Sequence, residues 1–215
     1  MKIEMGTDFP AYFEAAYPEE FDLFSHFEVG AGIPSVLFAI TTWKENGQPN
    51  VCLHAWSSFH GDPQGFFAVM GNLYMHTHTF ANIKRAQVFG MNFLPLCYYD
   101  ALVKTIHHNE METDELMVAG LHFEKARTVH APMIEEAFLQ MECTLKDIQD
   151  LSGAGQAAMV IGEVVHLAVS DEYATGYAPR YGKDGFMLLV PAPQDLVTGK
   201  PQQSAIATVH IEKYD

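Results

Sequence analysis

Positive charge is scarce in this sequence. The 215 residues include 12 Lys and Arg against 27 Asp and Glu, which gives a formal net charge of −15 with His counted as neutral. Nucleic acid and anionic membrane surfaces repel such a chain, so neither is an expected partner. A small phosphorylated ligand is still compatible with this balance, because it needs only a few local hydrogen-bond donors.

Cysteines and long apolar runs are also few. Cys52, Cys97 and Cys143 lie far apart and form no CxxC pair. An odd count without metal-ligand spacing argues against a disulfide framework and fits a reducing compartment. The chain opens with no signal-peptide pattern and has no apolar run of 18 or more residues. We therefore expect a soluble, cytoplasmic protein.

Motifs for nucleophilic catalysis and for the common nucleotide sites are missing as well. The sequence contains no G-x-S-x-G, no G-x-G-x-x-G and no G-x-x-x-x-G-K-[ST]. A serine triad, a Rossmann site and a P-loop are therefore disfavoured, and no catalytic side chain is predicted. His76 and His78 could share a metal ion, but no carboxylate follows at the spacing of known metal sites. We expect no metal.

The sequence that remains is mainly of β type. Asn46-Gly47 is a strong signal for a tight hairpin, because both residues tolerate positive φ angles. The stretch 75–94 reads as a polar strand end, a short helix and an apolar strand. Further strands are expected at 35–42, 49–56, 65–70, 137–150, 157–169 and 204–211.

Helical patterns are few and short. A helix is expected over 12–16, ended by Pro18, with a second turn through Phe24; another starts at 113–116 and ends at Gly120. The segment 95–111 reads as long and irregular. We predict a single domain over 1–215, a β barrel with helical additions. It consists of an aromatic-rich helical leader (1–32) that packs on the core or on a second subunit, a barrel core (33–170) and a less typical C-terminal segment (171–215).

The start of the short helix is a candidate anion site. Thr79 stands where an N-cap is expected, and the first helical turn leaves backbone N–H groups free for an anion. Lys84 and Arg85 follow within the same stretch. The alternative is an ordinary capped surface helix.

A second informative stretch is NVCLHAWSSF, residues 50–59. Trp56 offers a flat wall for an aromatic ring system, and Ser57 and Ser58 offer hydroxyls for ring heteroatoms or a phosphate. The alternative is a core tryptophan at a strand end, followed by turn serines.

The order of these motifs resembles the flavin reductase-like, FMN-binding split-barrel family, and most of all its flavoredoxin-type branch. The resemblance rests on N-x5-W-S-S, then H-T-F-x-x-I-K, then G-M-N-F-L, and extends from about residue 33 to 170. Downstream it continues through the stretches 114–126, 131–137, 141–145 and 160–165.

The resemblance implies a Greek-key split barrel and non-covalent FMN, bound near the subunit interface of a homodimer. The residues it implies around the flavin are Trp56, Ser57 and Ser58. Those it implies around the phosphate or ribityl chain are Thr77, His78 and Thr79. Weaker candidates for cofactor binding are Phe59, Asn50, His54 and His76. Many relatives carry a basic residue at or near the position of Thr77, which this chain lacks.

The implied activity is that of a flavin-dependent oxidoreductase. NADH or NADPH would reduce the FMN, and a small molecule or a protein would accept the electrons. Two alternatives stay open: an electron-transfer flavoprotein reduced by a protein partner, and a barrel that binds another small ligand without enzymatic activity.

Overall fold

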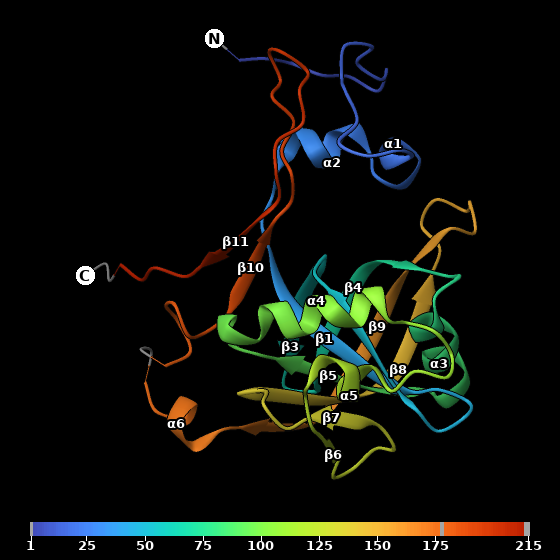
Figure 1. Cartoon of the computed structure of the whole chain (residues 1–215), viewed down its shortest axis with the longest axis vertical. Helices are drawn as coiled ribbons and strands as arrows, with labels where there is room; N and C mark the ends of the chain where they lie inside the picture. The colour runs from blue at the N-terminus through green and yellow to red at the C-terminus, as the bar shows by residue number, and fades with distance from the viewer. Residues whose placement is uncertain (1, 177–178, 213–215) are drawn as a thin grey trace. The chain divides into compact units, whose positions relative to one another are not determined.

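A computed structural model describes residues 2–176 and 179–212 of the chain (Figure 1). The described residues form two compact units. The smaller contains residues 2–35 and 188–207, and the larger contains 36–176, 179–187 and 208–212. The expected single domain over 1–215 stays a prediction.

The larger unit is built on an antiparallel sheet that curls into a barrel (Figure 1). Within it the strand order is β2-β1-β5-β8-β9-β4-β3. Because β5 lies between β1 and β8, and β4 lies beside β9, strands far apart in sequence are neighbours, as in Greek-key barrels. The mainly β fold predicted from the sequence is confirmed. The strands are β1 Ser35–Trp43, β2 Pro49–His54, β3 Ser57–Asp62, β4 Gly65–Tyr74, β5 Val88–Phe93, β8 Leu139–Gln149 and β9 Ala157–Val169. A separate pair, β6 Phe123–Lys125 and β7 Pro132–Ile134, is also antiparallel.

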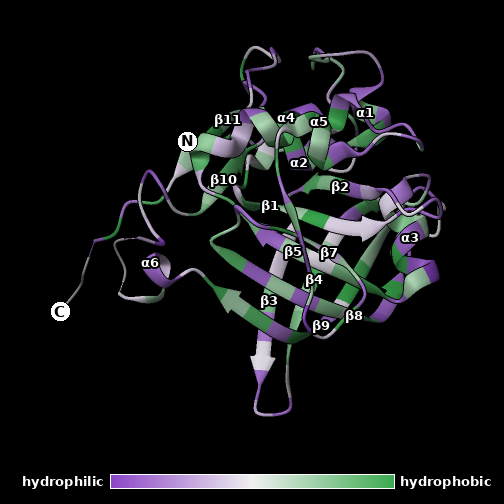
Figure 2. Ribbon diagram, turned by 60° about the horizontal axis from the view of Figure 1, so that its bottom comes forward, coloured by the Kyte–Doolittle hydropathy of each residue, from purple (hydrophilic) through white to green (hydrophobic). Residues whose placement is uncertain are grey.

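The barrel interior is filled by alternate side chains of these strands. Along β8, hydrophobic and hydrophilic residues alternate over much of the strand, as Figure 2 shows. Alternation of this kind lets a strand bury one face and expose the other. The largest side chains buried in this core include Phe38, Ile40, Met70, Ile83, Phe89, Met91 and Phe138.

The predicted hairpin joins β1 to β2. Thr42 pairs with Asn50, and Gly47 adopts a φ of 83°, which an L side chain rarely does. The Lys44 N–H donates to the Gln48 carbonyl over 2.9 Å and closes the turn. The Asn46-Gly47 prediction is therefore confirmed.

Three helices pack against β2: α3 (His78–Ala86), α4 (Tyr99–His107) and α5 (Glu115–Ala119). The expectation that 95–111 is irregular is wrong, because η1 (Leu96–Tyr98) and α4 occupy most of it. Leu102 and Thr105 of α4 are buried at helical spacing. A last short helix of this unit, α6, spans Asp171–Ala174.

The strand β3 is a second difference from the sequence expectation. One strand was predicted over 49–56, but β2 ends at His54 and Ser57 already pairs with Met70 of β4. The alternative reading of Ser57 and Ser58 as turn serines is wrong as well, since both belong to β3. The break falls where the chain changes its partner from β1 to β4, and β4 has a bulge between Met70 and Leu73 in its pairing with β9. At this bulge the Gly71 N–H donates to the Trp56 carbonyl over 2.7 Å.

A buried ion pair joins the hairpin to α5. Lys44 Nζ lies 2.8 Å from Glu115 Oε1, and both side chains are fully buried. Lys44 Nζ also donates to the carbonyls of Glu110 and Thr113, at 2.7 and 2.9 Å. The other carboxylate oxygen of Glu115 accepts from the Val51 N–H over 2.6 Å. The charges of the pair are thus embedded in hydrogen bonds that tie 110–115 to β2.

His54 is a buried histidine at the end of β2. Burial lowers its pKa to about 4, and a hydrogen bond to the Gly71 backbone offsets this only in part. The Gly71 N–H is already bonded to Trp56, so the partner of the imidazole is the Gly71 carbonyl, which only a ring N–H can bond. The neutral imidazole therefore carries its proton on the nitrogen that faces Gly71.

The smaller unit contains α1 (Glu20–Leu23), α2 (His26–Ala31), and most of the neighbouring strands β10 (Met187–Val190) and β11 (Ala205–Thr208). The predicted helix over 12–16 is wrong. Residues 10–13 form a turn closed by the Phe13 N–H on the Pro10 carbonyl, at 2.9 Å. The Glu14 N–H then donates to the Gly199 carbonyl over 2.7 Å, so the chain leaves helical geometry.

Within the described residues, no helix is long and apolar enough to cross a membrane.

Replacing Lys44 with Met should destabilise the protein by about 3–5 kcal/mol, because it leaves the Glu115 carboxylate buried without its counter-ion. The double variant K44M/E115Q should recover part of this loss, since Gln can still accept from Val51. The matched control is K146M, whose partner Glu163 and own side chain are both partly exposed; it should cost less than about 1 kcal/mol. Urea unfolding measures all three, and equal losses in K44M and K146M would contradict this description.

The protein should also become less stable as the pH falls, because of His54. Because its folded-state pKa is depressed, the unfolded chain takes up a proton below about pH 6.5 while the folded chain stays neutral down to about pH 4. The free energy of unfolding should therefore drop by about 3 kcal/mol across this window from His54 alone. Urea unfolding at several pH values should show that drop removed in His54→Gln and kept in His108→Gln, an exposed histidine. The same pH dependence in both variants would refute the assignment.

Candidate functional site

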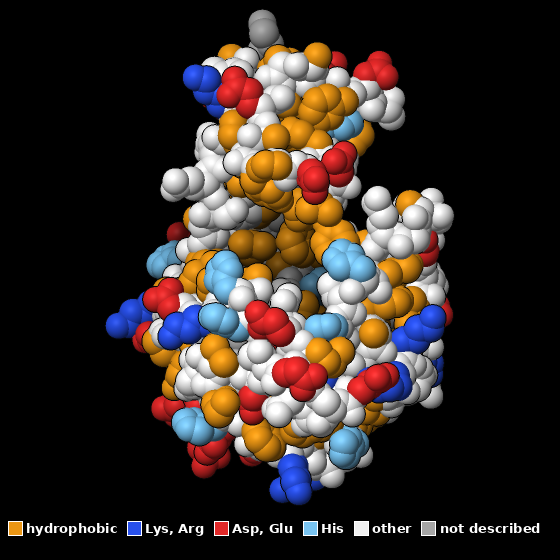
Figure 3. Space-filling view, turned by 45° about the vertical axis from the view of Figure 1, so that its right-hand side comes forward, with side chains coloured by type: hydrophobic (Ala, Val, Ile, Leu, Met, Phe, Trp, Pro, Cys, Tyr) orange, Lys and Arg blue, Asp and Glu red, His pale blue; other side chains and the backbone are white. Residues whose placement is uncertain are grey.

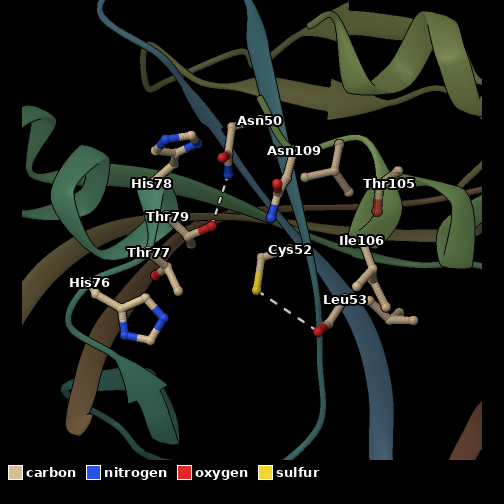
Figure 4. A pocket seen from close by; sticks show the side chains of 11 residues that line it. Asn50, Cys52, Leu53, His76, Thr77, His78, Thr79, Thr105, Ile106 and Asn109 are labelled. Atoms are coloured by element: carbon tan, nitrogen blue, oxygen red, sulfur yellow. Dashed lines mark hydrogen bonds between the residues drawn. The ribbon is translucent and has the colours of Figure 1, made fainter. Parts of the chain in front are cut away.

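A cavity of about 360 Å³ lies between β2, the start of α3 and the end of α4 (Figure 4). This volume is in the usual range for small-ligand sites. The structure brings His76, Thr77, His78 and Thr79 together here, as well as Asn50. The full lining is Asn50, Val51, Cys52, Leu53, His76, Thr77, His78, Thr79, Thr105, Ile106 and Asn109.

The N-cap of α3 is Thr77, so the expectation that Thr79 is the cap is wrong. Thr77 has extended backbone angles, and its Oγ1 accepts from the Phe80 N–H over 3.3 Å. The same hydroxyl donates to the Tyr74 carbonyl over 2.7 Å. The backbone N–H groups of His78 and Thr79 belong to the first turn and have no acceptor within the helix. They provide the positive end of the helix dipole beside the cavity.

Thr79 lies inside the first turn of α3 and is buried. Its Oγ1 accepts from Asn50 Nδ2 over 2.8 Å, and this bond joins α3 to β2 (Figure 4). Asn50 is buried as well, so the pair fixes the helix start against the strand.

Cys52 follows Asn50 on the same face of β2 and points into the cavity (Figure 4). Burial raises the pKa of the Cys52 thiol to about 11, although a hydrogen bond with Thr79 acts in the opposite direction. The thiol is therefore protonated near neutral pH and is a poor nucleophile.

The end of α4 forms the third wall, which the sequence reading missed. Thr105, Ile106 and Asn109 come from the segment that was expected to be irregular. The apolar spacing of Leu102 and Ile106 was a signal for this helix, but no local pattern shows that its end faces the start of α3.

Lysine and arginine are absent from the described lining of this cavity. Lys84 and Arg85 lie in the last turn of α3, about 10 Å along the helix from its start. Arg85 instead donates to the Trp43 carbonyl at 2.6 Å and pairs with Glu45 at 3.2 Å. The sequence predicted these two cations close to the anion site. In the structure they lie at the opposite end of α3.

The residues from Trp56 to Phe59 lie beyond β2 and do not line this cavity. Ser57 and Ser58 are consecutive in β3, so their side chains point to opposite faces of the strand. Ser58 Oγ lies 2.9 Å from His60 Nε2 on the exposed face, whereas Phe59 packs near Phe38 in the core. Only one of the two serine hydroxyls can thus face a given ligand.

Two buried polar atoms close to Trp56 have no hydrogen-bond partner among the described residues: His54 Nε2 and Ser57 Oγ. The His54 ring lies 6.1 Å from the Trp56 ring, measured between centroids. Because the proton of His54 is on its other nitrogen, Nε2 is a free acceptor. Unsatisfied groups of this kind are rare in protein interiors and mark a place where a polar ligand or water completes the bonding.

These side chains can bind a ligand, and the Cys52 thiol among them is poorly suited to nucleophilic chemistry. They provide backbone N–H groups, hydroxyls and amides for a polar, anionic chain, and an indole farther along for an apolar ring. No group of three His, Cys, Asp or Glu residues able to hold a metal ion occurs in 2–176 or 179–212.

Comparison with known proteins gives the same picture of the fold. A split-barrel protein from Shewanella frigidimarina, described as a proposed flavin reductase, superposes with a TM-score of 0.71 at 18% identity and covers 94% of this chain and 98% of its own. A flavoredoxin from Methanosarcina acetivorans gives 0.69 at 15% identity, covering 100% and 95%. An FMN-binding protein from Thermus thermophilus gives 0.67 at 16% identity, covering 100% and 99%.

Sequence comparison places the chain in a family. A curated but uncharacterised protein of Methanothermobacter thermautotrophicus is 32% identical over 105 residues, so the match spans about half of the length of each chain. Residues 29–183, well over half of the chain, match the model of the flavin reductase like domain. The chain therefore belongs to the flavin reductase-like domain family, as the order of its sequence motifs indicated.

Proposed function

We propose that this protein binds FMN and acts as a flavin-dependent oxidoreductase. The observation that supports this most strongly is the cavity at the start of α3, where free backbone N–H groups meet the hydroxyls of Thr77 and Thr79 in a chain of this family. Bound FMN would supply the redox chemistry, and the protein would supply position and electrostatics.

The residues present fit the phosphate end of such a ligand. The N–H groups of His78 and Thr79 would donate to phosphate oxygens, and the Thr79–Asn50 bond holds these donors in place. The flavin ring would lie farther along β2, against Trp56, with Ser57, Ser58 and Phe59 as further candidate contacts. His54 Nε2 and Ser57 Oγ, which lack partners, support a polar ligand on that side.

The proposed electron donor is NADH or NADPH, and the acceptor is a small molecule or a redox protein. Hydride transfer to a flavin requires no acid or base from the protein, which agrees with the composition of the site. The alternative is an electron-transfer flavoprotein reduced by a protein partner; the structural similarity to a flavoredoxin supports it. Homodimerisation and a cytoplasmic location, expected from the sequence, also stay proposals.

Titration of the purified protein with FMN tests the proposal. We expect a saturable change in the visible absorbance of the flavin, with one FMN bound per chain. A protein that takes up neither FMN nor any other flavin would overturn both flavin-based readings and leave a barrel for a different ligand.

The electron donor is tested by mixing the FMN-loaded protein with NADH or NADPH in the absence of oxygen. Bleaching of the yellow colour with either nucleotide supports the reductase. If the colour persists with both, the electron-transfer alternative stands in its place.

Replacing Thr79 with Val should weaken FMN binding by about 1–2 kcal/mol, roughly 5- to 30-fold in Kd, because Asn50 and the helix start lose their common bond. Thr42→Val is the matched control: Thr42 accepts from the buried amide of Asn82 over 3.1 Å but does not line the cavity. Both variants should lose about 1 kcal/mol of stability. Flavin titration should show weaker binding in Thr79→Val alone, and equal affinities would place the phosphate elsewhere.

A further inference from the structure

If the ligand of the cavity beside α3 is a phosphate monoester, few positive charges in the lining balance its negative charge. Such a group carries between one and two negative charges near neutral pH. The described lining contains no Lys or Arg, and the net charge of the whole chain is −15. The helix dipole alone offers about half an elementary charge. Hydrogen-bond donors suffice to bind such a group, and a further source of positive charge at the cavity would strengthen its binding.

The ionisable groups in the described lining are His76, His78 and Cys52. The Cys52 thiol is neutral because burial raises its pKa to about 11. The α4 wall contributes Thr105, Ile106 and Asn109, none of which titrates in the physiological range. Outside the lining, α4 and the loop after it carry Lys104, His107, His108 and Glu110, all exposed. The buried Glu115 of α5 accepts from the Val51 N–H and acts electrostatically on Cys52, but it is paired with Lys44. Tyr74 contacts the His76 ring. The lining thus leaves two histidines as its candidate cations.

Both histidines are placed to reach an anion at the helix start. His78 is the first residue of α3 and half-buried, and His76 precedes the cap and is exposed. Figure 4 shows their rings on either side of Thr77 and Thr79. The His76 ring packs against the Tyr74 ring, with centroids 5.6 Å apart, and this contact limits the rotation of the His76 side chain. Histidine side chains are also prominent on the face of the protein drawn in Figure 3.

We propose that protonated His76 and His78 neutralise the phosphate of the bound ligand, so that uptake of a phosphorylated flavin is coupled to uptake of protons. This inference rests on the proposed function and identifies the side chains that balance the charge of the phosphate. Histidine is the side chain whose charge changes between pH 5 and 8. A lysine or arginine stays charged at all these pH values, so it would not lose its hold on phosphate as the pH rises. This chain, in contrast, holds phosphate more tightly in mildly acidic conditions.

The test compares FMN with riboflavin, which has the same ring and ribityl chain but no phosphate. FMN should bind about 10-fold more tightly at pH 6 than at pH 8, whereas the affinity for riboflavin should change by less than about 2-fold. Fluorescence titration measures both. Identical pH dependence for the two ligands would overturn the inference, and failure of both ligands to bind at either pH would instead overturn the proposed function.

The double variant H76Q/H78Q should bind FMN with nearly the same affinity at both pH values. The control H107Q/H108Q removes two exposed histidines from the neighbouring helix end, so it changes the net charge equally, and should keep the wild-type dependence. A flattened response in H107Q/H108Q alone would contradict the assignment.

His76→Lys provides a gain-of-binding test that does not depend on loss of a fold. A lysine keeps its charge at pH 8, so this variant should bind FMN at pH 8 several-fold more tightly than the wild type and leave riboflavin affinity unchanged. Unchanged FMN affinity would show that position 76 does not face the phosphate.

Discussion

The buried pair of Lys44 and Glu115 is the interaction on which the candidate site depends most. Removing two charges from water is costly, and the pair offsets this only because each member also bonds backbone groups of 110–113 and of Val51. Those bonds fix three segments to one another: the end of the hairpin, the loop that follows α4, and the helix α5. Within the described sheet, β2 has a strand partner, β1, along one edge only. The bonds around the ion pair nevertheless hold β2 in place.

The groups that can bind a ligand line a cavity beside β2. Helices α3, α4 and α5 pack against this strand, and the start of one and the end of another leave a cavity between them. Asn50, Cys52 and His54 follow one another on alternate positions of β2 and so share a face. The face runs from the first turn of α3 toward Trp56, and a ligand with a phosphate at one end and an aromatic ring at the other matches that order of groups.

Much of this could be predicted from the sequence, because the signals are local. Asn46-Gly47 needs only the preference of its two residues for positive φ, and β8 shows its alternation directly. Order and spacing of short motifs were enough to indicate the family, and residues 76–79 do meet Asn50 in one cavity. Whether Trp56, Ser57, Ser58 and Phe59 contact a flavin is still a prediction.

The failures have a common physical cause: they concern bonds between segments far apart in sequence. Glu14 leaves helical geometry because Gly199 accepts its N–H, and β2 ends where the chain changes its strand partner from β1 to β4. Neither of these partners lies within the window that a local pattern covers, and the same holds for the α4 wall of the site. The cap of α3 is the exception, because Thr77 bonds the Phe80 N–H and the Tyr74 carbonyl, each three residues away.

A crystal structure of the protein with FMN tests the central claim most directly. The account predicts phosphate oxygens within hydrogen-bond distance of the N–H groups of His78 and Thr79, with the flavin ring extending along β2 toward Trp56. FMN bound with its phosphate away from the start of α3 would contradict it.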